Sequence, residues 1–141
     1  MASNILRSGH ADLIIPDVYS QDAVSVVGWL QENLSFSDEY LAQLVGARPE
    51  QYSEWKRGGH TLTRSQLRKL KNLSTTMNRL LSFFNFRRDL MMRVLEFHSD
   101  SNQFRRTRCT PPWLGTSLRP YLLRRGGIAA VDSWVQKDKI R

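Results

Sequence analysis

The sequence predicts an all-α protein, and three observations support this class. Apolar residues recur at intervals of three and four along most of the chain, as they do on the buried face of an amphipathic helix. Glycine and proline cluster between the periodic stretches, where turns are expected. The length of 141 residues and the hydrophobic share of 40% suit one compact domain, or a small domain with an appended module.

The first helix is expected after an irregular start. Residues 1–19 have no clear period, so we predict a flexible N-terminal arm, with one short extended segment before Pro16. From Ser20, a suitable N-cap, a helix is predicted to run to about Asn33. Its apolar residues share one face and are Ala23, Val24, Val27, Leu30 and Leu34.

Residues 36 to 58 are predicted to form two short helices joined by a sharp turn. Gly46 ends the first helix, because glycine takes the left-handed conformation without strain, and Pro49 suits the first turn of the second. The second helix should bury Tyr52 and Trp55 and end at Gly58. These offsets are typical of a DNA-binding helix-turn-helix, although ordinary helical bundles also contain such pairs. The buried positions of the first helix are Tyr40, Leu41, Leu44 and Val45.

The outward face of the second helix is mixed in charge. Gln51, Ser53 and Arg57 have the groups that bond base edges or phosphates. Glu50 and Glu54 on the same helix repel phosphate. Because residues 36 to 58 hold three basic and four acidic side chains, this motif does not supply the electrostatic affinity for DNA by itself.

A long helix is predicted to follow, with Thr63 as its N-cap and Gln66 in the matching capping-box position. Its apolar stripe is too wide for a solvent-exposed helix, so it should cover the two-helix motif, a second subunit, or both. Arg64 and Arg68 lie off the stripe near the helix start and are expected to contact phosphates. The stripe consists of Leu67, Leu70, Leu73, Met77, Leu80, Leu81 and Phe84.

A further helix and a linker complete the first predicted domain, residues 20–98. The helix should bury one apolar face, made of Phe86, Leu90, Met91, Val94, Leu95 and Phe97. Residues 99–112 then lose all periodicity. We interpret them as a linker, made basic by Arg105, Arg106 and Arg108 and stiffened by two prolines.

The tail, residues 113–141, is predicted to form a small helical module. A short helix through Leu118, Tyr121 and Leu122 should break at Gly126 and Gly127. A last helix from Ile128 to about Gln136 places Val131, Trp134 and Val135 on one face. About 30 residues hold little core of their own, so the module should dock on the rest of the chain, on a second copy, or on another protein.

The net charge of +8 is unevenly placed. Residues 1–62 hold four basic and eight acidic side chains, whereas residues 63–141 hold 17 basic and five acidic ones. A basic half favours a polyanionic partner, most often nucleic acid, because neutralised phosphates release counterions. The alternative is a solvated basic surface that maintains solubility.

Several classes of function are not favoured. The single cysteine, Cys109, excludes an internal disulfide, and no His, Cys or carboxylate cluster has the spacing of metal ligands. No paired groups suit acid-base or nucleophilic catalysis, so we expect no metal, no cofactor and no enzymatic activity. The apolar runs are too short to cross a bilayer and the start lacks a secretory signal, so a cytoplasmic protein without a membrane partner is expected.

The order of these parts resembles the Xre/MbcA/ParS antitoxins of bacterial toxin-antitoxin pairs. The segment YLAQLVGARPEQYSEWKRG is similar to their Cro/Xre-like helix-turn-helix, and TLTRSQLRKLKNLSTTMNRLL to their connecting helices. The segment PPWLGTSLRPYLLRRGGIAAVDSWV resembles their C-terminal toxin-binding module. The resemblance covers roughly residues 24 to 136. The chain differs from the family at Tyr52, where a smaller residue is usual, at Glu54, where a basic residue is frequent, and in its basic tail.

The resemblance implies an all-helical homodimer with two partners. One is double-stranded DNA at its own operon, and the other is a cognate toxin protein, in several such pairs an NAD-consuming enzyme. The residues implied to face DNA are Arg48, Gln51, Ser53, Lys56 and Arg57. The residues implied to face the toxin are Trp113, Leu114, Gly115, Leu118, Tyr121 and Leu122.

We therefore expect an antitoxin-like DNA-binding regulator that represses its own operon and neutralises a partner toxin. Two alternatives stay open. One is a stand-alone helix-turn-helix transcriptional regulator, of phage or host, whose tail serves dimerisation. The other is an adaptor whose acidic recognition helix binds another protein.

Overall fold

The computed structural model describes residues 23–59, 61–100, 104 and 110–139. Within these ranges the chain forms seven α-helices and no strand, which confirms the predicted all-α class. The expected arm over residues 1–19, the N-cap Ser20 and the linker arginines lie outside the described residues. The helices are α2 (Ala23–Leu34), α3 (Asp38–Val45), α4 (Pro49–Lys56), α5 (Arg64–Phe83), α6 (Arg88–Glu96), α7 (Leu118–Leu122) and α8 (Gly127–Lys139).

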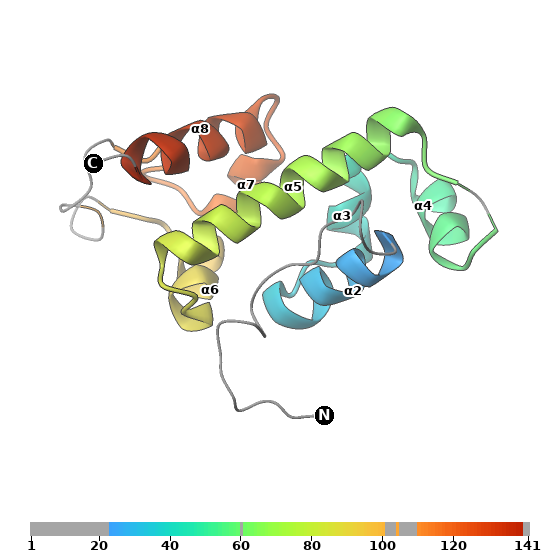
Figure 1. Cartoon of the computed structure of the whole chain (residues 1–141), viewed down its shortest axis with the longest axis horizontal. Coiled ribbons are helices and arrows are strands. Elements are labelled where there is room, and N and C mark those ends of the chain that lie inside the picture. Colours follow the sequence, from blue (N-terminus) through green and yellow to red (C-terminus); the bar gives the residue numbers. More distant parts are fainter. Residues whose placement is uncertain (1–22, 60, 101–103, 105–109, 140–141) are drawn as a thin grey trace.

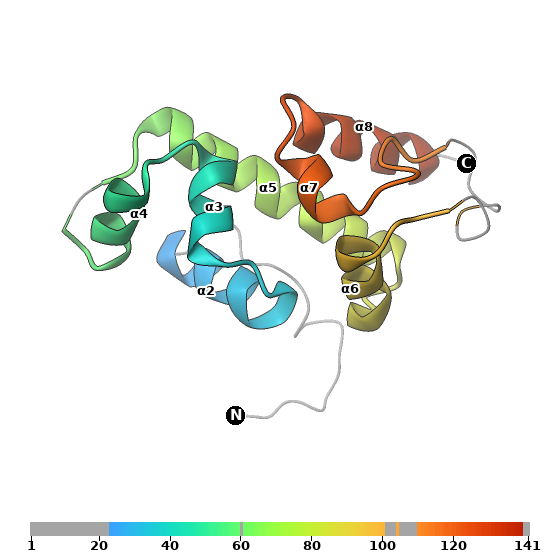
Figure 2. The same ribbon diagram turned by 180° about the vertical axis from the view of Figure 1, so that it is seen from behind.

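The long helix α5 runs through the middle of the molecule (Figure 1). Helices α2 and α3 lie on one side of it and α8 on the other, while α6 lies near its C-terminal end (Figures 1 and 2). Helix α4 follows α3 at the end of the molecule where α5 begins. The two predicted parts of the chain therefore share one central helix.

Helix α5 begins and packs as its sequence predicts. The Thr63 hydroxyl accepts the Gln66 amide at 3.1 Å, and the Gln66 side chain accepts the Thr63 amide at 2.9 Å, which completes the capping box. Most of the predicted stripe is buried, whereas Leu67 and Phe84 are half-buried. Ser74 and Thr76 are buried as well, because α5 is covered on two sides. The fully buried stripe residues are Leu70, Leu73, Met77, Leu80 and Leu81.

The tail docks on α5 of the same chain, which is one of the three placements predicted for it. Val131, Trp134 and Val135 of α8 are buried in the apolar cluster that α5 also lines. An aromatic contact joins the tail to α5, because Phe83 meets Trp134 edge to face at a centroid distance of 4.9 Å. At the edge of this contact, Arg79 binds both carboxylate oxygens of Asp132 at 2.7 Å. Within the tail, Trp113 also meets Trp134 edge to face, at a centroid distance of 5.1 Å.

One prediction about the buried faces was wrong, and one buried residue was not predicted. Phe97 was expected in the core, but its side chain is 66% exposed. Helix α6 ends at Glu96, and Phe97 is in the extended conformation, so it leaves the helical face that buries Met91, Val94 and Leu95. Val26 lies off the predicted stripe of α2 but is fully buried, because α2 presents a wider face to the core than its strongest period indicates.

Phe36 is expected to be essential to the packing between the α2–α3 loop and the tail. Its ring is 1% exposed, so Phe36→Ala should lower the free energy of unfolding by about 3–5 kcal/mol. The matched control is Phe97→Ala, which removes an exposed ring and should change stability by less than about 0.5 kcal/mol. Urea denaturation of the full chain measures both. Equal losses would contradict the packing described here.

Candidate functional site

The turn between α3 and α4 has the geometry that its residues predict. The Ser37 hydroxyl caps α3 by accepting the Tyr40 amide at 3.1 Å. Gly46 takes the left-handed conformation with φ +77°, and the Ala47 amide donates to the Ala42 carbonyl at 2.9 Å. Pro49 opens α4, as expected. This turn fixes where α4 leaves α3.

The inner face of α4 is aromatic. Tyr52 and Trp55 are both buried, with ring centroids 5.6 Å apart, which confirms their predicted positions. Burial, together with the neighbouring Asp38 carboxylate, raises the pKa of the Tyr52 hydroxyl above its ordinary value. The opposite face of α4 is consequently directed to solvent.

The candidate DNA-contacting residues divide into two groups. The larger group is exposed at the surface of α4, its N-terminal cap and the start of α5. Glu50 and Glu54 are exposed on the same outward face of α4. Both signs of charge therefore reach solvent there. The exposed candidates are Arg48, Ser53, Arg57, Arg64 and Arg68.

Gln51 belongs to the second group, because its amide is bonded within the chain. It donates to the Gln66 side chain at 2.8 Å and accepts from it at 3.2 Å. Gln66 is buried and also donates to the Gly46 carbonyl at 3.2 Å. This amide pair connects α4, the turn and the start of α5, so Gln51 positions α4 in this structure.

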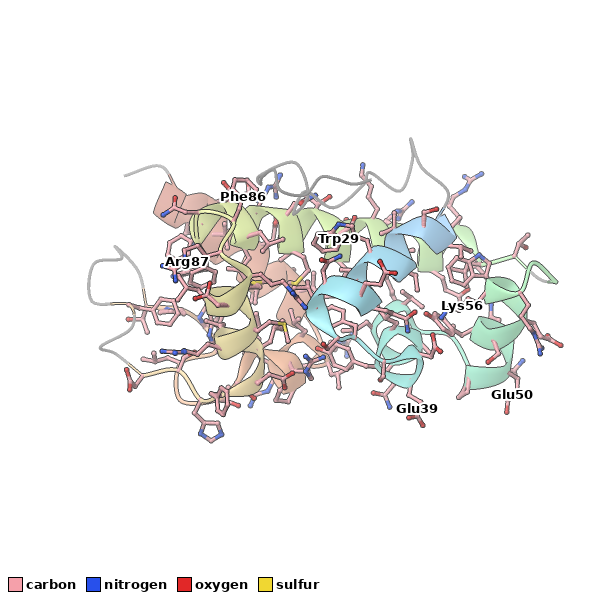
Figure 3. The ribbon with its side chains drawn as sticks, turned by 90° about the horizontal axis from the view of Figure 1, so that it is seen from below. Trp29, Glu39, Glu50, Lys56, Phe86 and Arg87 are labelled. Carbon is pink, nitrogen blue, oxygen red and sulfur yellow. The ribbon has the colours of Figure 1, made fainter. Side chains whose placement is uncertain are left out.

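Lys56 is likewise bonded within the chain. Its ammonium group donates to Asp38 and to Gln31, each at 2.8 Å, and Gln31 donates to Asp38 at 2.9 Å. Figure 3 shows Lys56 between α4 and the helices beside it, whereas Glu39 and Glu50 point away from the body of the molecule. The hydrogen bond from Lys56 holds the pKa of Asp38 below its ordinary value. Lys56 therefore ties α4 to α2 and α3.

The residues implied to face a partner protein lie mostly inside. Trp113, Leu118 and Leu122 are buried in the core of this chain, while Leu114 and Tyr121 are half-buried. The indole of Trp113 donates to the Ser99 hydroxyl at 3.0 Å. Of the six residues only Gly115 is exposed. The longest run of exposed residues in the described part of the module is the turn after α7, which contains Leu123, Arg124, Arg125 and Gly126.

Sequence reasoning missed Arg119, which joins the tail to the α2–α3 loop and to α6. Its guanidinium group lies 5.2 Å from the Phe36 ring centroid and 5.4 Å from that of Tyr40. It also donates to Glu96 at 2.7 Å and to the Leu34 carbonyl at 3.2 Å, and its own carbonyl accepts the Tyr40 hydroxyl. No local pattern in the sequence marks this residue, since its partners lie far away along the chain.

The described part of the chain contains neither a metal site nor a membrane-spanning helix. No group of three or more His, Cys, Asp or Glu side chains is placed there to hold a metal ion. None of the helices it contains has the length and apolar character that crossing a membrane requires.

Comparison with known proteins adds no assignment. The chain matches no protein-family model, and no curated protein resembles it significantly in sequence.

The Lys56–Asp38 pair predicts a pH dependence of stability. Because the folded-state pKa of Asp38 is lowered, its contribution is complete above the unfolded pKa near 3.8 and is lost as pH falls through the folded value. Both side chains are partly solvated, so the pair is expected to contribute about 0.5–1 kcal/mol. Asp38→Asn should therefore destabilise the chain at pH 7 and have little effect at pH 2, as measured by denaturant titration.

Glu39→Gln is the matched control for that variant. Glu39 lies in the same first turn of α3 but points away from Lys56. Glu39→Gln therefore measures the loss of a carboxylate near a helix N-terminus without the loss of a contact with Lys56. If both variants lost the same stability at pH 7, the Lys56 interaction would not be the cause.

Proposed function

We propose that this protein is an antitoxin-like regulator. In this proposal a Cro/Xre-like helix-turn-helix binds double-stranded DNA at its own operon, the chain acts as a homodimer, and the C-terminal module neutralises a toxin protein. The proposal rests chiefly on the α3–Gly46–α4 unit, in which buried Tyr52 and Trp55 leave Arg48, Ser53 and Arg57 exposed on the outward side. The resemblance of the tail to toxin-binding modules supports the second role.

The charge around α4 indicates how DNA would be held. Glu50 and Glu54 weaken attraction at the outward face of α4, so phosphate contacts must come from the flanking cations. Arg48 and Arg57 stand at the two ends of α4, and Arg64 opens α5. In this arrangement α4 enters the groove and the flanking arginines bind the backbone on either side of it.

The exposed turn after α7 is the surface best suited to a partner protein. Leu123 is 42% exposed, and Arg124 stacks over the ring of Tyr121 at 5.1 Å. Arginine and tyrosine are both enriched at the centres of protein interfaces, and Leu123 adds exposed apolar surface beside them. Trp113, Leu118 and Leu122, buried beneath it, would position this turn.

A second candidate function follows from the same burial. Because the apolar side chains of the tail are covered by α5, the module needs no partner to remain folded. This observation favours a stand-alone helix-turn-helix transcriptional regulator, of phage or host, whose tail surface serves dimerisation.

Arg57→Ala and Arg64→Ala should each weaken binding to the DNA upstream of the gene. Loss of one phosphate contact should lower the slope of log affinity against log salt by about 1. Arg93→Ala removes an exposed arginine on α6, at the other end of the molecule, and should leave both affinity and slope unchanged. Fluorescence anisotropy across a salt series measures this. Identical slopes for all four proteins would count against DNA contact through α4 and α5.

The antitoxin role is tested by co-expression with the neighbouring reading frame. The neighbour alone should arrest growth, and the intact chain should restore it. Leu123→Asp should abolish that protection while DNA affinity is retained, whereas Phe97→Asp, a change at another exposed apolar residue, should keep both. A neighbour that is harmless when expressed alone would favour the second candidate function. Protection that survives Leu123→Asp would show that the toxin contact lies elsewhere than the turn after α7.

A further inference from the structure

A groove of about 950 Å³ lies between α3, α5 and the turn that joins α7 to α8. Gln43 and Leu44 of α3 form one wall, and residues 122–129 form the opposite one. The turn stands beside α5 in both ribbon views (Figures 1 and 2). All three main parts of the molecule therefore meet around this space.

The groove is strongly basic. Its cations outnumber its carboxylates by six to one, and the one carboxylate, Asp132, is already bound to Arg79 at 2.7 Å. No ion pair among the described residues involves Lys69, Arg125 or Lys137, and all three side chains are exposed. Gathering like charges is unfavourable unless an anion balances them. The six cations are Lys69, Lys71, Arg79, Arg124, Arg125 and Lys137.

Two glycines shape the turn that carries Arg124 and Arg125. Gly126 has φ +74°, and a Cβ on Gly127 would lie 2.3 Å from the Tyr121 carbonyl oxygen, so no larger residue fits there. The Gly127 amide donates to the Arg124 carbonyl at 2.8 Å, which closes the turn. The first turn of α8 lines the groove at this point, and its amides add to the attraction for an anion.

The rest of the groove is not charged. Leu123 and Ile128 contribute apolar surface beside the cations, since Leu123 is 42% exposed and Ile128 is half-buried. The volume is in the range of about 300–1,000 Å³ that is usual for small-molecule sites. A groove that combines several cations with apolar surface suits a compact ligand with both phosphate and apolar parts.

We propose that this groove binds a phosphorylated small molecule of the nucleotide class. The phosphates would lie against Lys69, Arg124 and Arg125 near the start of α8, and the base would lie on the apolar wall of Leu123 and Ile128, beside Gln43 of α3. A ligand held there contacts α3, α5 and the tail together, so its binding stabilises their packing. The proposal is independent of the proposed function, because its test contains neither DNA nor a partner protein.

The test is titration of the full chain with ATP, pyrophosphate and adenosine, followed by calorimetry and thermal unfolding. ATP is expected to bind and to raise the melting temperature. Adenosine, which lacks phosphate, should do neither. Pyrophosphate should bind more weakly than ATP, because it cannot use the apolar wall. No binding of ATP or pyrophosphate at millimolar concentration overturns the proposal, and equal affinities for these two overturn its nucleoside part.

Variants locate the site. Arg125→Gln and Lys69→Gln should each weaken ATP binding by about ten-fold, the effect of losing one charge-assisted hydrogen bond. Both side chains are exposed, so folding should be retained, and circular dichroism verifies this. Arg93→Gln removes the same charge from α6 and should leave the affinity unchanged. Equal weakening by all three variants, or binding of a short duplex in place of ATP, would show that the groove is not a nucleotide site.

Discussion

The structure depends on the burial of α5 from two opposite sides. Helix α3 covers one side of α5 near its beginning, and α8 covers the other side along the second half of α5. An isolated helix of this composition would expose a large apolar surface to water, which is unfavourable. That surface consists of Leu70, Leu73, Met77, Leu80 and Leu81. Each covering helix is short and carries little core of its own. The fold is therefore stable only when both are docked.

Arg119 adds directional contacts to this non-directional packing. Its guanidinium group is held by two aromatic rings, one carboxylate and two backbone carbonyls, which come from residues 34–40 and from α6. Because these contacts of the guanidinium group are directional, Arg119 sets the position of α7 against the α2–α3 loop. Arg119 therefore connects the tail directly to the segment that leads into α3.

The parts of the fold that local chemistry decides could be predicted from the sequence. Gly46, Pro49, Thr63 and Gln66 act within one turn of the residues they influence, so their roles follow from position alone. The apolar period likewise identified most of the α5 stripe. Phe97 was misplaced because the period continues one residue beyond the end of α6, where the backbone becomes extended.

The candidate site was harder to predict because it depends on long-range contacts. Gln51 and Lys56 lie on the outward part of α4 by period, yet their partners Gln66 and Asp38 are 15 and 18 residues away. The contact between Arg119 and Leu34 spans 85 residues. In the sequence, Trp113 and Leu118 are compatible with either a protein interface or a buried core. Only the packing of α8 in the structure distinguishes the two.

The order of the helices along the chain has a consequence for biosynthesis. Thr76 of α5 and Asp132 of α8 meet across 56 residues of sequence. At about 5–20 residues per second, a ribosome needs several seconds to make that interval. During this time the apolar stripe of α5 has no α8 to cover it, so the nascent chain is exposed to chaperones and proteases until translation has passed α8.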